Sequence, residues 1–261
     1  MKEKTAERAP KPAAEKPGGR RLNISMKDGK CVVERTFSGI PGLDEMIGGG
    51  IPRGNLVVLS GDPGSGKTVF CLQFLYEGAK KYGESGVYVS LEETEDAIVS
   101  GALEFGMDIK ELIDQEKLKI ITIELYDFER LKNAVEDTVA SINAVRVVID
   151  PGVIFKLFFD RELEARKRIV SLGKMFKRIG CTTIITSEIS LDKTQSLYGL
   201  EEYVADGVLL LYHTKLRNRF VRSIGILKMR NTEISEQLKP IQITDNGVKV
   251  LTKAELFEEV G

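Results

Sequence analysis

The stretch Gly61-Asp62-Pro63-Gly64-Ser65-Gly66-Lys67-Thr68 decides the fold of this 261-residue chain. It matches the pattern G-x-x-x-x-G-K-[ST] and lies between the apolar run Asn55–Ser60 and the amphipathic segment Thr68–Lys81. Glycines let the backbone turn tightly, so that exposed N–H groups and the start of the following helix surround a negative charge. A chance match is the alternative, and the order of strand, loop and helix argues against it. The sequence therefore predicts a phosphate loop whose nucleotide contacts come from this run and from Val69.

Segments typical of strands and of helices alternate on both sides of this loop. Strands are predicted at Asn55–Ser60, Val87–Leu91, Lys119–Leu125, Val145–Asp150, Cys181–Ser187, Val208–His213 and Ser223–Met229, and helices at Thr68–Lys81, Thr94–Phe105, Phe128–Ile142 and Glu162–Ile179. Such alternation predicts an α/β fold with a mostly parallel, twisted sheet and helices on both faces. Beyond Val208 the helical pattern stops. Hairpin turns at Lys215–Arg219 and Asp245-Asn246-Gly247 then predict a C-terminal antiparallel β extension.

The first part of the chain differs from the rest in composition. Residues 1–30 are rich in Lys, Pro, Ala and Glu and are predicted to form a flexible basic tail, whereas residues 31–261 are predicted to form one domain. The tail lacks the apolar segment of a signal peptide, so the expected location is the cytoplasm. No run approaches the roughly 18 consecutive apolar residues that cross a bilayer, so membrane insertion is not expected.

Composition argues against several other kinds of site. Cys31, Cys71 and Cys181 are too far apart in sequence for a C-x-x-C or metal pattern, and they are expected to be reduced. The single histidine, His213, cannot form a metal site alone and is predicted at a strand end. The net charge of −1 gives no overall attraction to nucleic acid.

Two residues of the loop and one aspartate are expected to act on the phosphates and the metal. Lys67 is expected to reach the β- and γ-phosphates, and the Thr68 hydroxyl to bind Mg²⁺. Asp150 ends the buried run Val145–Asp150 and is expected to hold the same ion through water. An ordinary aspartate that begins a turn before Pro151 is the alternative, which the phosphate loop disfavours. The predicted ligands are ATP and Mg²⁺, although no base-reading motif separates ATP from GTP.

Glutamates that follow two predicted strands are candidates for the hydrolytic chemistry. Glu92 and Glu93 end Val87–Leu91, and the carboxyl ends of parallel strands line the ligand crevice of such a sheet. Because neighbouring side chains on a strand point to opposite faces, only one of the pair is expected to face the γ-phosphate. A positioned base contributes about 10²–10⁴-fold to a rate. The alternative role is a solvated pair that caps the helix near Thr94. Glu188, after the strand expected beside the metal strand, is a candidate γ-phosphate sensor or a structural residue.

Several further segments carry a family resemblance. They are Phe37-Ser38-Gly39-Ile40-Pro41-Gly42-Leu43-Asp44, Gly48-Gly49-Gly50-Ile51-Pro52-Arg53-Gly54, Glu92-Glu93, the strand that ends at Asp150, Thr186-Ser187-Glu188 and Leu227-Lys228-Met229-Arg230-Asn231-Thr232. In this order they resemble the KaiC branch of the RecA-type ATPases, over roughly residues 31–250. Together they are far more specific than the phosphate loop alone. The resemblance implies a RecA-type P-loop NTPase core.

The resemblance also implies roles for particular residues. Glu92 and Glu93 resemble the paired catalytic glutamates of the family. Lys228 and Arg230 resemble the residues that reach the γ-phosphate of a neighbouring subunit, although alternation on a surface strand would give the same spacing. Such a contact would place ATP between subunits of a homo-oligomer, typically a hexameric ring. Charge supplied in this way is worth about 10³–10⁵ in rate.

The chain departs from the family pattern at several places. The clock proteins of the family carry two tandem ATPase domains, and this chain has room for one. Pro151 follows the metal aspartate, where serine is frequent, and Asn231 stands where glycine is usual. Thr194 and Ser196 lie near the position of the phosphorylated residues of the clock protein, but the local sequence differs. Autokinase activity and clock function are therefore not carried over.

Three functions remain open at this point. The leading one is an ATPase that acts as an oligomeric, nucleotide-driven switch, with or without a further protein partner. The second is an ATP-dependent assembly or regulatory module with little turnover. The third is a DNA repair or recombination factor, which would use the basic residues Lys156, Arg161, Arg166, Lys167, Arg168, Lys193, Arg217, Arg219 and Arg222. Asp160, Glu162 and Glu164 interrupt these residues, so nucleic acid is not the favoured partner. A small-molecule kinase is disfavoured because no lid domain or acceptor site is recognisable.

Overall fold

The computed structural model describes residues 24–27, 30–123, 128–151, 162–188, 205–216 and 218–255. Residues 1–23 of the predicted tail lie outside the described residues, as do Lys156, Asp160, Arg161, Lys193, Thr194, Ser196 and Arg217. Within the described ranges, no helix combines the length and the apolar character needed to cross a membrane.

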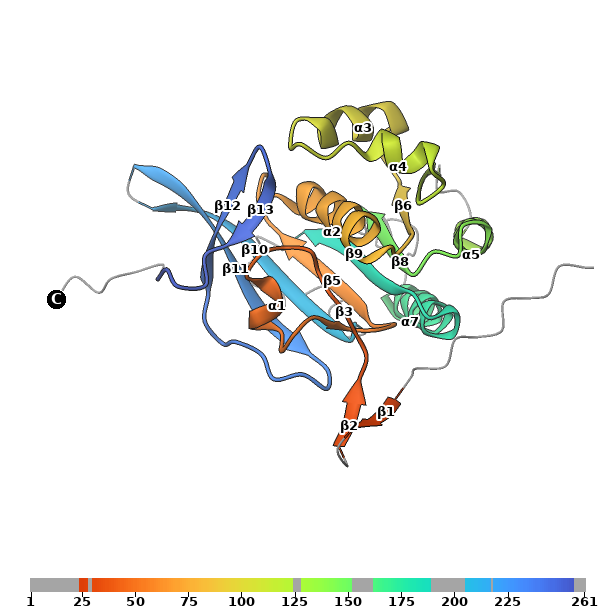
Figure 1. Ribbon diagram of the computed structural model, residues 1–261, viewed down its shortest axis with the longest axis horizontal. Helices are drawn as coiled ribbons and strands as arrows, with labels where there is room; N and C mark the ends of the chain where they lie inside the picture. Colours follow the sequence, from red (N-terminus) through yellow and green to blue (C-terminus); the bar gives the residue numbers. More distant parts are fainter. Residues whose placement is uncertain are drawn as a thin grey trace, which may run out of the picture.

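A large sheet forms the centre of the molecule (Figure 1). Across the described residues it has nine strands, in the order β13-β12-β11-β10-β5-β9-β8-β6-β7. Their bounds are β5 (Leu56–Gly61), β6 (Gly86–Ser90), β7 (Leu118–Thr122), β8 (Arg146–Asp150), β9 (Thr182–Glu188), β10 (Gly207–Leu216), β11 (Arg219–Met229), β12 (Lys239–Thr244) and β13 (Gly247–Val250). Pairing is parallel from β10 to β7 and antiparallel from β10 to β13. The predicted parallel core and antiparallel extension are therefore confirmed.

Helices cover both faces of this sheet (Figure 1). They are α1 (Leu43–Met46), α2 (Lys67–Tyr82), α3 (Glu95–Leu103), α4 (Ile109–Asp114), α5 (Phe128–Ser141) and α7 (Glu162–Ile179). Side chains of α1 to α4 share one apolar core, and those of α5 and α7 share another. The alternation along β8 explains the division, because Val148 enters the first core while Val147 and Ile149 enter the second. The middle of β8, Val147 to Ile149, is thus apolar on both faces, as expected of a parallel strand.

Short strands precede the sheet in the chain. β1 (Ile24–Lys27) and β2 (Lys30–Val33) pair as a hairpin, and β3 (Arg35–Thr36) pairs with β4 (Ile51–Pro52). The boundary predicted between residues 30 and 31 falls inside the paired strands of the hairpin. Regular structure thus begins within the stretch predicted as a tail. The division into tail and domain stays a prediction.

Several local expectations differ from the structure. Strand β6 ends at Ser90, so Glu92 and Glu93 lie in a bend after the strand rather than on it. The argument that they point to opposite faces of a strand was therefore wrong. His213 lies inside β10, not at a strand end, because β10 and β11 remain paired as far as Leu216 and Arg219. Helix α4 was not predicted.

Two departures from the family pattern have structural counterparts. Asn231 has a φ of 58°. Asparagine tolerates this left-handed conformation better than most residues, which explains how it stands where glycine is usual. The peptide bond between Asp150 and Pro151 is cis.

Candidate functional site

The predicted phosphate loop connects the end of β5 to the start of α2. Gly61 is the last residue of β5, and Gly66 precedes the first residue of α2 with a φ of 102°. A Cβ atom on Gly66 would lie 2.5 Å from Cδ1 of Ile243, and one on Gly61 would lie 2.6 Å from Oγ of Ser65. A larger side chain at either position would therefore force a neighbouring atom to move. The loop leads into the N-terminus of α2, with Pro63 and Gly64 exposed, which suits the binding of phosphate oxygens.

Lys67 lies across this loop. Its Nζ donates to the carbonyl oxygens of Gly61, at 2.8 Å, and of Asp62, at 3.2 Å. Burial lowers the pKa of the Lys67 ammonium, while the nearby charges of Glu188, Asp150 and Asp62 act in the opposite direction. The Lys67 ammonium thus lies among hydrogen-bond acceptors at the start of α2, within the loop that a phosphate of ATP would contact.

Asp150 collects hydroxyl groups from different elements at the carboxyl edge of the sheet. Its Oδ2 accepts from Thr68 Oγ1 of α2, at 3.1 Å, and from the Tyr88 hydroxyl of β6, at 2.6 Å. Its Oδ1 accepts from Thr186 Oγ1 of β9, at 2.6 Å. Burial, followed by the charge of Asp150, raises the pKa of the Tyr88 hydroxyl, which therefore stays a donor. These neutral donors orient Asp150 without cancelling its negative charge.

Thr68, Asp150 and the glycine-rich loop fit Mg²⁺ and a nucleoside triphosphate. Among the described residues, no group of three or more His, Cys, Asp or Glu side chains could hold a metal ion. Mg²⁺ does not need such a group, since it usually binds one or two carboxylates, waters and substrate phosphates. The paired oxygens of Thr68 and Asp150 supply that limited donor set next to the glycine-rich backbone. The geometry therefore matches the chemistry of a phosphate-bound magnesium ion.

The three predicted glutamates lie at the same edge of the sheet. Glu188 is the register partner of Gly61 and is exposed. Glu92 and Glu93 are also exposed, and the preceding Leu91 donates its N–H to the Asp150 carbonyl at 3.1 Å. The Glu93 N–H donates to Ser90 Oγ at 2.9 Å, which stabilises the bend after β6. The structure thus brings all three glutamates to the end of the sheet that carries the phosphate loop.

Lys228 and Arg230 lie towards the other end of the sheet. Lys228 is level with Val208 of β10, which is level with Val58 of β5. Gly61 is three residues further along β5, or about 10 Å at the rise of a strand. Arg230 follows the end of β11 and lies further still from the loop. The structure therefore does not bring this pair to the phosphate loop of its own chain.

The pairing between β10 and β11 contains an irregularity just before Lys228. Val208 pairs with Lys228, whereas the next residue, Leu209, pairs with Ile226. Leu227 is therefore an extra residue on β11, as in a β-bulge. Its side chain is partly exposed, at 40%.

Sequence reasoning missed several neighbours of the phosphate loop. Arg222 Nε donates to the Gly64 carbonyl at 2.9 Å, and the backbone N–H of His213 donates to Asp62 Oδ2 at 2.9 Å. Tyr88 was also missed, because an aromatic residue inside an apolar strand is typical of a core position. No local sequence signal identifies Arg222, since its contact depends on the curvature of a distant hairpin.

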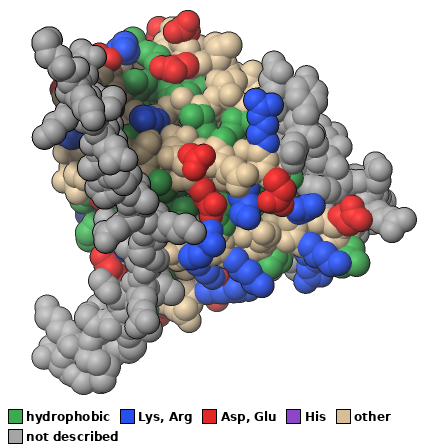
Figure 2. Space-filling view, turned by 90° about the vertical axis from the view of Figure 1, so that its right-hand side faces the viewer, with side chains coloured by type: hydrophobic (Ala, Val, Ile, Leu, Met, Phe, Trp, Pro, Cys, Tyr) green, Lys and Arg blue, Asp and Glu red, His purple; other side chains and the backbone are tan. Residues whose placement is uncertain are grey.

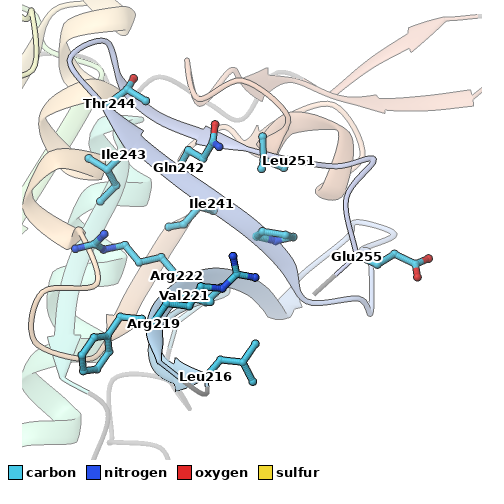
Figure 3. A pocket seen from close by; sticks show the side chains of 12 residues that line it. Leu216, Arg219, Val221, Arg222, Ile241, Gln242, Ile243, Thr244, Leu251 and Glu255 are labelled. Carbon is cyan, nitrogen blue, oxygen red and sulfur yellow. The ribbon is translucent and has the colours of Figure 1, made fainter. Parts of the chain in front are cut away.

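A cavity of about 540 Å³ adjoins the loop, between β11 and β12 (Figure 3). These strands pair at Ser223–Pro240 and Ile224–Lys239 and diverge towards the loop. Side chains of both strands face the resulting space. Its lining consists of Leu216, Arg219, Phe220, Val221, Arg222, Pro240, Ile241, Gln242, Ile243, Thr244, Leu251 and Glu255. Arg222 and Ile243 thus belong both to the cavity and to the surroundings of the loop glycines.

Comparison with known proteins decides the family. A family model described as "ATPase: KaiC" matches residues 36–255. The chain belongs to the KaiC family of ATPases. The predicted membership is therefore confirmed, and a member of this family is a nucleotide-binding protein.

Relatives within the KaiC family are of two lengths. A UPF0273 protein of Methanocaldococcus jannaschii is 33% identical over 84% of this chain and 96% of its own length. The circadian clock oscillator protein KaiC of Acaryochloris marina is 32% identical over 85% of this chain but only 44% of its own length. The crystal structure of a KaiC-like protein of Pyrococcus horikoshii is similar with a TM-score of 0.76, at 36% identity over 84% of this chain and 99% of that one.

Proposed function

We propose that this KaiC-family protein hydrolyses ATP with Mg²⁺ and acts as an oligomeric, nucleotide-driven switch. The observation that carries the proposal is the division of the candidate residues between the two ends of one sheet. The phosphate loop, Asp150 and the glutamates occupy one end, whereas Lys228 and Arg230 lie towards the other. Two copies of the chain placed end to end would complete a site that one copy leaves divided.

The residues at the loop end have separate proposed roles in binding and hydrolysis. Loop N–H groups and Lys67 hold the phosphates, and Thr68 and Asp150 hold the metal. Bound Mg²⁺ supplies charge neutralisation and orients the phosphates. One of the two carboxylates, of Glu92 or Glu93, accepts the proton of the water whose oxygen attacks the γ-phosphorus, while the bond from that phosphorus to the β–γ bridging oxygen breaks and ADP leaves. Glu188, next to Gly61 in the register, responds to the γ-phosphate.

The cavity beside the loop is the proposed place for the base and ribose of ATP. Its volume of about 540 Å³ lies in the range of small-molecule sites. Arg222 bonds to the loop carbonyl of Gly64 and also lines the cavity, so that one side chain connects the phosphate and nucleoside regions. Ile243 supplies an apolar contact at the same junction.

A neighbouring subunit would supply Lys228 and Arg230. Each is separated along the strands from the loop of its own chain, so neither reaches a phosphate bound there without refolding of the hairpin. In a ring, each subunit can present its Lys228 and Arg230 to the phosphate loop of the next subunit, so that every site is complete. The proposed ring has six subunits. Head-to-tail contacts of this kind close into rings when the rotation permits.

The proposal predicts that both turnover and assembly depend on nucleotide. Glu92→Gln with Glu93→Gln should lower multiple-turnover phosphate release by about 10²–10⁴-fold, because a positioned base is lost. The same samples should still show the ATP-dependent increase in mass. The exposed pair Glu104→Gln with Glu236→Gln is the matched control and should keep wild-type turnover. Wild-type turnover in the Glu92 and Glu93 variant would show that the assigned chemistry is wrong. ATP-dependent assembly without turnover in the wild type would instead support a regulatory module.

Nucleic acid is not favoured as a partner. Arg168 of α7, one of the candidates for DNA contacts, is engaged with α5, where it bonds to Glu129 at 2.5 Å. Arg178 of the same helix pairs with Glu136 of α5. Acidic and basic side chains are interspersed on the side of the molecule that Figure 2 shows. Mixed charge of this kind is typical of a solvated helix face. Absence of single-stranded DNA binding at low salt would agree with this view, because phosphate contacts are strongest there.

A further inference from the structure

Asp206 is a buried carboxylate next to the end of the sheet that presents Arg230. It directly precedes β10, and only 3% of its surface is exposed. Its Oδ1 accepts from Lys177 Nζ of α7, at 2.7 Å, and from Arg230 Nη1, at 3.1 Å. Its Oδ2 accepts from the backbone N–H of Leu56 at 3.1 Å. The carboxylate therefore joins α7, β5 and the segment after β11.

Asp206 holds Arg230 through two hydrogen bonds, one from the Arg230 backbone and one from its side chain. The Arg230 N–H donates to the Asp206 carbonyl at 2.8 Å, in addition to the guanidinium bond. The guanidinium bond is monodentate through Nη1. A guanidinium has five N–H donors, so such a bond leaves the rest of the fork free to face an oxyanion. Asp206 thus restrains Arg230 without consuming its capacity to bind phosphate.

The charges around Asp206 do not cancel. Two cations share one carboxylate oxygen, which gives the three side chains a formal net charge of +1. Arg230 is 56% exposed at its side chain, whereas Asp206 is 5% exposed. The positive charge is therefore on the solvent side and the negative charge is inside. A phosphate that approaches this end meets the cation first.

Asp206 also connects Arg230 to the strand that carries the phosphate loop. The Asp206 N–H donates to the carbonyl of Leu56 at 2.8 Å, and the Leu56 N–H returns a bond to Oδ2. Leu56 is the first residue of β5, and Gly61 at the other end of β5 begins the loop. In each subunit, Arg230 is thus linked through Asp206 to β5, the strand that leads into the phosphate loop of the same subunit.

We propose that Asp206 is a positioning residue that orients Arg230 towards the phosphate of ATP bound by a neighbouring copy of the chain. The inference rests on the proposed supply of Arg230 between subunits. Asp206 does not touch the nucleotide and acts only through Arg230. A purely structural role, in which Asp206 joins β10 to β5, would leave the supplied cation equally effective without the carboxylate.

Mixed rings separate these roles. A subunit with Lys67→Ala is expected to lose ATP binding but to present Arg230, whereas a subunit with Arg230→Ala binds ATP but presents no cation. Each is expected to be inactive alone. Mixing should restore phosphate release at sites where Arg230 of the first faces ATP of the second. The test then replaces the first subunit by one carrying both Lys67→Ala and Asp206→Asn.

The expected result is restored turnover lower by on the order of 10-fold or more, because a small misplacement of a catalytic group is costly. Lys67→Ala with Asp114→Asn, an exposed aspartate on α4, is the matched control and should restore turnover fully. Native mass measurement verifies that each pair forms mixed rings. If Asp206→Asn prevents assembly, Asp206→Glu is used instead, and it should restore turnover only in part because its carboxylate is displaced by one methylene.

The outcomes distinguish the two proposals. If native mass measurement shows Lys67→Ala subunits in rings with Arg230→Ala subunits and turnover is still not restored at all, the supply of Arg230 between subunits is wrong. If they do, and the Asp206→Asn or Asp206→Glu subunits restore it equally well in mixed rings, the positioning role of Asp206 is wrong while the supply of Arg230 stands.

Discussion

Asp150 and Asp206 lie at opposite ends of the parallel strands, and their partners differ in charge. Asp150 accepts from the hydroxyls of Thr68, Tyr88 and Thr186. Asp206 accepts from two cations and a backbone N–H. Hydroxyl donors leave the charge of Asp150 available, so its end of the sheet attracts a cation. The two positive charges of Lys177 and Arg230 exceed the single negative charge of Asp206, so this end of the sheet attracts an anion. The same residue type thus prepares one edge for a metal and the other for a phosphate.

For the comparison of the two aspartates, the largest expected effect comes from neutralising Asp150. Asp150→Asn should lower turnover on the order of 100-fold or more, because metal-ion neutralisation of the phosphates is worth several kcal/mol. It should also raise the Mg²⁺ concentration needed for half-maximal phosphate release. Asp206→Asn should lower turnover less and leave that Mg²⁺ midpoint unchanged. Equal shifts of the Mg²⁺ midpoint in both variants would contradict the assignment of the metal to the Asp150 end of the sheet alone.

A backbone variant tests whether the loop end depends on conformation as well as on charge. Gly66→Ala places a Cβ against Ile243 at a position with a φ of 102°. Left-handed backbone costs a residue with a Cβ about 1–2 kcal/mol, which corresponds to roughly 5–30-fold weaker ATP binding by calorimetry. Gly101→Ala, inside α3, is the control, since beyond its chain neighbours and the nearby helix backbone no described atom lies within 4 Å of its Cβ position. Equal affinities for the two variants would show that the loop adapts freely.

A smaller effect is expected from removing one hydroxyl around Asp150. Tyr88→Phe deletes the 2.6 Å bond to Oδ2 while Thr68 and Thr186 still hold the carboxylate. A lost hydrogen bond of this kind costs about 1 kcal/mol, or roughly a fivefold rise in the Mg²⁺ midpoint. Tyr82→Phe, on a partly exposed tyrosine, should have no such effect. An unchanged midpoint in Tyr88→Phe would limit the orienting donors to the threonines.

The smallest effect is a dependence on alkaline pH. Burial lowers the pKa of Lys67, so the folded protein loses this proton at a lower pH than the unfolded chain does. The unfolded state then binds more protons, and the contribution of Lys67 to stability rises with pH between the two pKa values. ATP affinity should fall in the same window, because phosphate favours the charged ammonium. Thermal unfolding with and without ATP should show the two trends diverging. Lys67→Met should lack the rise in stability, and a rise that persists in this variant would assign it to another group.

Much of the fold could be predicted because its signals are local. The run around Gly66 specifies a loop by glycine chemistry, and an aspartate at the end of an apolar run identified Asp150. A helix was predicted from Thr94, and Thr94 caps the N-terminus of α3, where its Oγ1 accepts from the Ala97 N–H at 3.4 Å. The turn around Asn246 was likewise recognised from its composition, and it connects β12 to β13.

The remainder depends on pairings that no local pattern contains. Tyr88 and Arg222 reach the site from distant strands, and each is ordinary in its own segment. Asp206 gains its partners from three separate elements. Glu92 was assigned to the correct edge but with the wrong local geometry, because the end of β6 depends on the Ser90 side chain. Roles for the glutamates, Lys228 and Arg230 stay predictions.

The extra residue at Leu227 decides which face of the sheet Lys228 occupies. On a regular strand, Ile226 and Lys228 would share a face, because side chains two residues apart do so. They pair instead with the neighbours Leu209 and Val208, whose side chains point to opposite faces, so Lys228 lies on the face opposite to Ile226. A relative that lost one residue at the bulge could therefore keep both the hairpin and the face of its lysine. A relative that kept every residue type but paired this strand regularly would carry its lysine on the opposite face, a change that alignment of residue types alone would overlook.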